Sequence, residues 1–101
     1  MTFQNALKSL LTAGAFALAA TAQAQNIAVG TGGTGGVYYP MGGGIAAALS
    51  KYVPGMQATA EVTGGSVSNL QLIATGKPYI GFTMVDAAKD AANGEGKFKD
   101  K

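Results

Sequence analysis

The chain has 101 residues and a formal net charge of +2, and 48% of its residues are hydrophobic. This length allows at most one domain, and the composition is that of a globular chain. The small charge gives no argument for binding nucleic acid or an anionic membrane surface. Because the sequence has no Arg, His, Cys or Trp, the usual general base, thiol chemistry and most metal ligands are excluded, and we expect no catalytic residue, metal or cofactor.

The first 24 residues have the pattern of a secretory signal peptide. Lys8 gives a positive start, residues 9–20 form an apolar core, and residues 22–24 (Ala-Gln-Ala) are a small-x-small cleavage site. The core is short for a bilayer span, and the alternative interpretation is a buried N-terminal helix. We predict a signal peptide over residues 1–24, export to the periplasm, and no stable membrane insertion after cleavage. The mature chain would begin at Gln25 and have 77 residues (101 minus 24).

A glycine-rich loop follows the first predicted strand. Residues 26–30 predict the strand, and residues 30–36 hold five glycines and two threonines. Pro40 suits the first turn of a helix, where its missing N–H costs little. Apolar residues then recur at helical spacing as far as the stop at Pro54-Gly55. These residues are Met41, Ile45, Leu49 and Tyr52.

The same order repeats after Gly55. Residues 57–62 predict a second strand, and residues 63–66 (Thr-Gly-Gly-Ser) predict a second glycine turn. We place Ser66 as the N-cap of the next helix, since its hydroxyl can accept a hydrogen bond from an unpaired N–H. An apolar stripe over residues 67–74 predicts that helix, with Gly76 at its C-terminal end.

A third strand and helix complete the pattern. Residues 79–83 are almost wholly apolar and predict a strand buried on both faces. Residues 85–92 predict a helix, and the charged residues 95–101 show no pattern. Strands that alternate with helices in the order βαβαβα predict an α/β fold with a parallel sheet and right-handed crossovers. A unit of this size is marginal by itself, so we expect a fragment of a longer protein.

Ligands of parallel sheets bind beyond the carboxyl ends of the strands, and both glycine turns and Thr83 fall there. Glycine allows a backbone to approach a ligand closely, and helix starts offer unpaired N–H groups. The hydroxyls of Thr31, Thr34 and Ser66 add donors. Donors without fixed charge suit phosphate or carboxylate. The alternatives are that the glycines serve turn geometry only, that Ser66 is a cap, and that Asn69 is a solvated helix position.

A dinucleotide-binding domain of an oxidoreductase is the alternative function. Residues 30–35 match G-x-G-x-x-G after a strand, and Glu61 lies near the end of the second strand, where an acid would bind the ribose. However, Glu61 comes later than the usual spacing of roughly 20 residues, and the predicted export argues against a nicotinamide enzyme.

Three segments resemble the TAXI-type solute receptors of TRAP transporters. They are residues 30–40, residues 63–70, and Ile80-Gly81-Phe82 with Asp86. The resemblance covers residues 25–101. It implies the two-lobed fold of type II periplasmic binding proteins, with residues 25–101 as the N-terminal, incomplete part of the first lobe.

The resemblance also implies a non-enzymatic receptor. Such a receptor binds a small carboxylate, such as glutamate or another organic acid, and presents it to a membrane subunit of the TRAP transporter. The family commonly has Gln-Ser where this chain has Met84 and Val85, so we expect Thr83 to supply the hydroxyl at that strand end. The predicted ligand-binding residues are Thr31, Gly32, Gly33, Thr34, Gly35, Gly36, Tyr39, Gly65, Ser66, Asn69 and Thr83.

Overall fold

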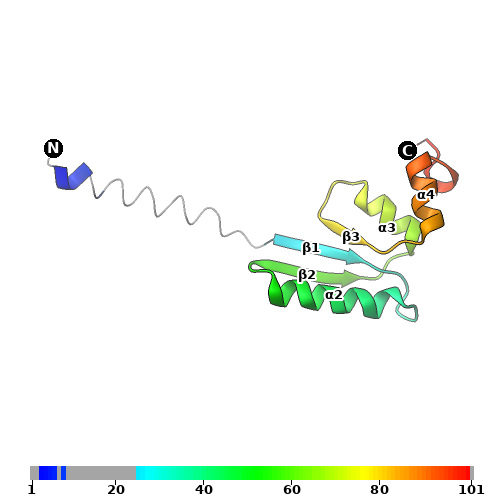
Figure 1. Cartoon of the computed structure of the whole chain (residues 1–101), viewed down its shortest axis with the longest axis horizontal. Helices are drawn as coiled ribbons and strands as arrows, with labels where there is room; N and C mark the ends of the chain where they lie inside the picture. Colours follow the sequence, from blue (N-terminus) through cyan, green and yellow to red (C-terminus); the bar gives the residue numbers. More distant parts are fainter. Residues whose placement is uncertain (1–2, 7, 9–24, 101) are drawn as a thin grey trace.

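The structure, a computed structural model, describes residues 3–6, 8 and 25–100 (Figure 1). The apolar core and the cleavage site of the predicted signal peptide lie outside the described residues, so the signal peptide stays a prediction. Within the part of the chain that the structure describes, no helix is long and apolar enough to cross a membrane.

Strands and helices alternate along residues 25–100 in the predicted βαβαβα order. Each predicted boundary lies within two residues of the observed one. The elements are β1 (Gln25–Gly30), α2 (Tyr38–Tyr52), β2 (Met56–Glu61), α3 (Ser66–Ile73), β3 (Tyr79–Gly81), α4 (Val85–Asn93) and the 3-10 helix η1 (Gly96–Phe98) (Figure 1).

The three strands form a parallel sheet in the order β2-β1-β3, which confirms the α/β fold. The last residue of β1, Gly30, lies opposite Glu61 of β2 and Gly81 of β3. All three strands therefore end at one level, and the loops that follow them share one edge. The chain adds β2 on one side of β1 and β3 on the other, so the topological switch point lies between β1 and β3. Open parallel sheets bind their ligands at such a point.

Successive residues of β1 face opposite sides of the sheet, and the α2 side is packed closely. Val29 and Thr31 are both 0% exposed on this side. The buried residues of α2 are Gly42 and Ala46. A Cβ at Gly42 would collide with the side-chain methyl of Thr31, so the absence of a side chain there lets α2 approach the sheet.

The apolar residues whose spacing predicted α2 do not form its buried face. Met41, Ile45 and Tyr52 are exposed by 51%, 37% and 73%. The helix was predicted correctly, but these three residues are exposed and Leu49 is half-buried, whereas the close approach to the sheet buries Gly42 and Ala46.

The prediction for the third strand was wrong in two respects. β3 ends at Gly81 rather than Thr83, and its residues are half-buried rather than buried on both faces. Within the described residues β3 pairs only with β1, so its other edge has no strand beside it. The N–H of Phe82 still donates to the Gly30 carbonyl at 3.1 Å, and Thr83 belongs to the loop before α4.

The predicted N-cap of α3 was also wrong by one residue. Gly65 is the N-cap, with φ 99° and no side-chain capping bond. This φ lies in the region that favours glycine, so the capping position carries no side chain. Ser66 is the first helical residue, and its Oγ accepts a hydrogen bond from the N–H of Met84 at 2.9 Å.

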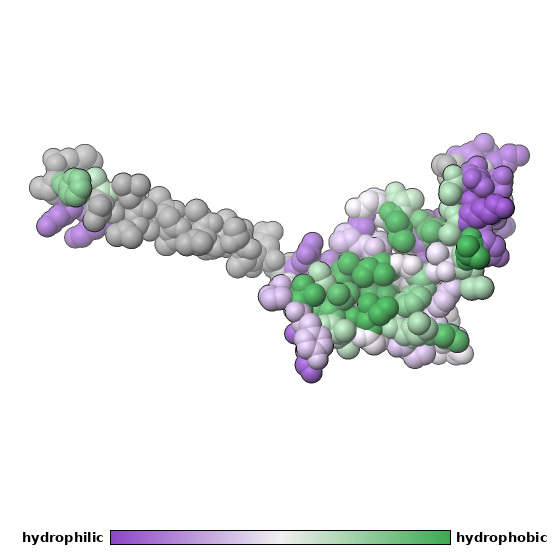
Figure 2. All heavy atoms as spheres, in the orientation of Figure 1, coloured by the Kyte–Doolittle hydropathy of each residue, from purple (hydrophilic) through white to green (hydrophobic). Residues whose placement is uncertain are grey.

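The charged C-terminal segment, predicted to have no pattern, contains η1. Its Phe98 is only 8% exposed, and η1 lies against α4. One aromatic residue has no periodicity, which is why the pattern did not predict this turn. Figure 2 shows hydrophilic residues gathered over α4 and the C-terminal end, and a broad hydrophobic region over the sheet and α2.

Candidate functional site

The side-chain amide of Asn69 joins the ends of all three strands. Its Nδ2 donates to the carbonyls of Thr31 and Phe82, each at 2.7 Å. Its Oδ1 accepts from the hydroxyl of Thr63 at 2.6 Å. Thr31, Thr63 and Phe82 follow β1, β2 and β3, and Asn69 is 1% exposed. This one side chain therefore fixes the spacing of the loops at the carboxyl edge.

Two paired glycines make room for Asn69 on the sheet. A Cβ at Gly30 would lie 2.7 Å from Asn69 Oδ1, and one at Gly81 would lie 3.0 Å from Asn69 Cβ. Gly30 and Gly81 are register partners, so together they form a surface without side chains on which α3 packs. Gly30, the first glycine of the G-x-G-x-x-G match, is thus explained by packing within the protein.

Thr31, which accepts a hydrogen bond from Asn69, is also bonded to the end of β2. Its Oγ1 donates to the carbonyl of Glu61 at 2.6 Å, and its N–H donates to that carbonyl at 3.0 Å. In the described part of the chain, every buried side-chain nitrogen or oxygen has a hydrogen-bond partner. Thr31 and Asn69 were both predicted to contact the ligand, but the structure assigns their side-chain polar atoms to bonds within the protein.

A depression of about 270 Å³ lies at the carboxyl edge, between the loop after β1 and the loop after β3. One wall is fixed, because the ring of Tyr38 stacks on the ring of Phe82 with 5.1 Å between centroids. Three glycines and three larger apolar or aromatic residues line it: Gly32, Gly33, Gly36, Val37, Tyr38 and Met84.

The glycine loop contains glycines that the described chain does not require. At Gly33 and Gly35 no atom lies within 4 Å of the place a Cβ would occupy, and neither residue has a positive φ. Gly42 and Gly30 differ, since a Cβ there would collide with a neighbour. A molecule that approaches the backbone of this loop from outside would give Gly33 and Gly35 a reason to be glycine.

The start of α3 lies beside this depression. The Cα of Gly65 is 4.0 Å from the place a Cβ of Gly32 would occupy. The N–H of Gly65 donates to Thr63 Oγ1 at 3.1 Å, whereas the N–H groups of the first turn of α3 have no acceptor within the helix. Backbone donors and the positive end of the helix dipole thus lie next to the glycine loop.

The remaining predicted residues are spread along this edge. Thr34, Gly35 and Gly36 are exposed in the loop. Tyr39 is 38% exposed but does not line the depression. Thr83 Oγ1 donates to the carbonyl of Met84 at 3.1 Å, so its proton serves a local bond.

Sequence reasoning missed four residues as members of the site. Val37, Tyr38 and Met84 line the depression, and Thr63 bonds to Asn69. The available signal was position, because each residue lies in a loop after a strand or at the helix start that follows it. Within the described residues, no group of three or more His, Cys, Asp or Glu is placed to hold a metal ion.

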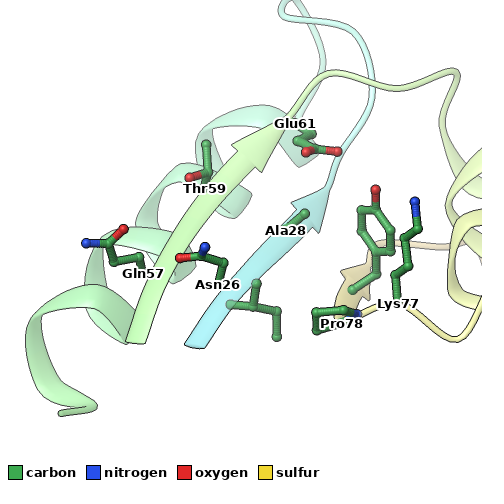
Figure 3. Close-up of a pocket in the computed structure, with 9 residues that line it drawn as sticks. Asn26, Ala28, Gln57, Thr59, Glu61, Lys77 and Pro78 are labelled. Carbon is green, nitrogen blue, oxygen red and sulfur yellow. The ribbon is translucent and has the colours of Figure 1, made fainter. Parts of the chain in front are cut away.

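A larger concavity of about 420 Å³ lies on the sheet itself (Figure 3). Part of its lining stands on the face of β1 and β2 opposite α2, as Figure 3 shows for Asn26, Thr59 and Glu61. Lys77, Pro78 and Tyr79 complete it. Both faces of a parallel sheet are ordinarily covered by helices, and this concavity follows the strand bodies rather than their carboxyl ends. We therefore assign the candidate ligand site to the smaller depression.

The fold and the position of this depression define a class. The parallel α/β unit, with its loops gathered at one sheet edge, agrees with part of a lobe of a periplasmic-binding-protein-like protein, and the family match gives this class. Residues 29–101 match the model of the NMT1-like family, so the chain belongs to the NMT1-like family. The dinucleotide alternative is not supported by this match, and Glu61 lines the sheet-face concavity rather than the depression.

Proposed function

We propose that this chain is the N-terminal part of the first lobe of an extracytoplasmic solute receptor of the TAXI type. The receptor binds a small carboxylate, glutamate-like or another organic acid, for uptake by a TRAP transporter. It is exported to the periplasm by residues 1–24 and is not an enzyme. Its partners are the ligand and the membrane subunit of the transporter. The family match supports a receptor role, and the three resembling segments favour the TAXI type.

The observation that carries the proposal is the pair of open glycines. Gly33 and Gly35 leave the loop backbone uncovered at the carboxyl edge, beside the unpaired N–H groups that begin α3. Backbone N–H groups at such a position bind an anion without a charged side chain. The sequence has no Arg and no Lys lines the depression, so we propose that these backbone groups bind the carboxylate.

A thermal-unfolding screen of the full-length protein with organic acids tests the proposal. A ligand that binds only the native state stabilises it by about 2.7 kcal/mol at 100 times its Kd. We expect at least one carboxylate to raise the Tm in a concentration-dependent manner. If no member of a panel of mono- and dicarboxylates and amino acids raises the Tm, the proposal is wrong.

A pair of glycine variants locates the binding. Gly33→Ala adds a methyl group in open space, so the native state accepts it, but a bound ligand would collide with it. We expect affinity to fall at least tenfold while the Tm without ligand stays unchanged. Gly43→Ala is the control, because Gly43 is also open but lies in α2. Equal affinity in both variants would place the ligand elsewhere.

A further inference from the structure

The depression at the carboxyl edge is lined by uncharged, mostly apolar residues. None of its six lining residues carries a charge, and the Tyr38 hydroxyl is their one polar side-chain group. Val37 and Met84 are exposed by 70% and 60%, so their hydrocarbon surface is open to a bound molecule. The backbone of the glycine loop forms the rest of the lining.

Two side-chain hydroxyls bond to the backbone of Met84. Ser66 Oγ accepts the N–H of Met84 at 2.9 Å, and Thr83 Oγ1 donates to the carbonyl of Met84 at 3.1 Å. Both bonds fix the backbone of Met84 at the rim. Its side chain is unbranched and adapts readily to an apolar partner, whereas Tyr38 is held against Phe82.

A second carboxylate on the ligand would find no positively charged partner among the lining residues. The sequence has no Arg, and no Lys is among the lining residues. A charge placed against Val37 and Met84 would lose water without gaining a counter-ion, which is unfavourable. An alkyl or aryl group at the same place would instead bury apolar area, which strengthens binding roughly fourfold for each buried methylene.

Resting on the proposed function, we infer that the site selects monocarboxylates with an apolar body over dicarboxylates. The single carboxylate binds the loop backbone, and the branched aliphatic or aromatic body lies against Val37, Tyr38 and Met84. This class excludes glutamate as the preferred ligand, because its side-chain carboxylate would face the apolar wall.

Calorimetric titration of the full-length protein with isosteric acids tests this selectivity. Glutarate and 5-methylhexanoate differ only in the distal group, which is a carboxylate in one and an isopropyl group in the other. Aspartate and leucine form a second such pair. We expect the apolar member of at least one pair to bind at least tenfold more tightly. Equal or tighter binding of glutarate and aspartate overturns this inference and leaves the proposed function standing. Failure of every acid to bind overturns both.

A matched pair of methionine variants ties the selectivity to the wall. Met84→Gln should narrow the ratio between 5-methylhexanoate and glutarate at least threefold, because an amide replaces hydrocarbon beside the ligand. Met41→Gln is the control, since Met41 is 51% exposed on α2 but does not line the depression. A ratio that is unchanged in Met84→Gln, or changed equally in both variants, overturns the assignment of the wall.

Discussion

Replacement of Asn69 by Leu should destabilise the protein strongly, because a nearly isosteric apolar side chain cannot make the three hydrogen bonds of the amide. In the native structure these bonds reach Thr31, Phe82 and Thr63 at 2.6–2.7 Å, with Asn69 only 1% exposed. The three partner groups differ in whether they can form a new hydrogen bond after the replacement. Thr63 Oγ1 already lies 3.2 Å from the Thr31 carbonyl, so after the replacement these two groups can pair with each other.

The Phe82 carbonyl is left without that rescue. An unpaired buried polar group costs about 1–3 kcal/mol, and each lost hydrogen bond costs about 1 kcal/mol net. The Phe82 carbonyl stays unpaired, and the bonds of Asn69 to Thr31 and Thr63 are replaced by one bond between those two residues. We therefore expect a loss of roughly 3 kcal/mol in the free energy of unfolding. This is a large part of the total of about 5–15 kcal/mol for a typical domain.

Urea unfolding of the full-length protein, followed by circular dichroism, measures this loss. Gln71→Leu is the control, because Gln71 is exposed on the same helix and such changes usually alter stability by less than about 0.5 kcal/mol. A loss below about 1 kcal/mol in Asn69→Leu, with an unchanged urea dependence, would refute the role given to the amide.

Three further substitutions, with Gly44→Ala as a control, test the packing of the same edge. Gly42→Ala should lower the free energy of unfolding by about 1–3 kcal/mol, because its methyl group collides with Thr31. Gly44→Ala meets no atom within 4 Å and should instead stabilise the exposed helix by up to about 1 kcal/mol. Equal effects of the two variants in urea unfolding would argue against the close approach of α2. Thr31→Val keeps the methyl contact and removes the 2.6 Å hydroxyl bond to Glu61, so a loss of about 1 kcal/mol is expected, and no loss would show that this bond does not stabilise the fold. Gly65→Ala forces a side chain onto φ 99° and should cost about 1–3 kcal/mol, a result that an unchanged Tm would contradict.

The order of elements could be predicted from the sequence because it depends on local patterns. A short apolar run followed by helical spacing occurs three times, with a glycine turn between them in the first two cases, and each stretch carries its own signal. The errors fall where tertiary contacts decide the outcome. Phe98 is buried in the turn η1, which lies against α4, and the buried face of α2 is set by how closely Gly42 approaches Thr31.

The edge that carries the candidate site could also be predicted, but the roles within it could not. Parallel strands bring their following loops together whatever the side chains are, so the glycine loop and the second turn were expected to meet. The bonds of Asn69 join residues 6, 13 and 38 positions apart. No local pattern shows which of the polar residues at this edge has its side chain buried. Asn69 was therefore predicted to contact the ligand, and its hydrogen bonds to the loops after the three strands were not predicted.

The glycines show most clearly why neighbours rather than residue type decide a role. Gly30 and Gly42 have atoms where a side chain would be, so their small size serves the packing of α3 and α2. Gly65 has open space but a φ of 99°, so its role is conformational. Gly33 has neither constraint, and neither have Gly43 and Gly44 of α2, but Gly33 alone of these three lines the depression where we propose that the ligand binds. The loss of affinity expected from Gly33→Ala should therefore come without a loss of stability, a separation that the packing glycines cannot give.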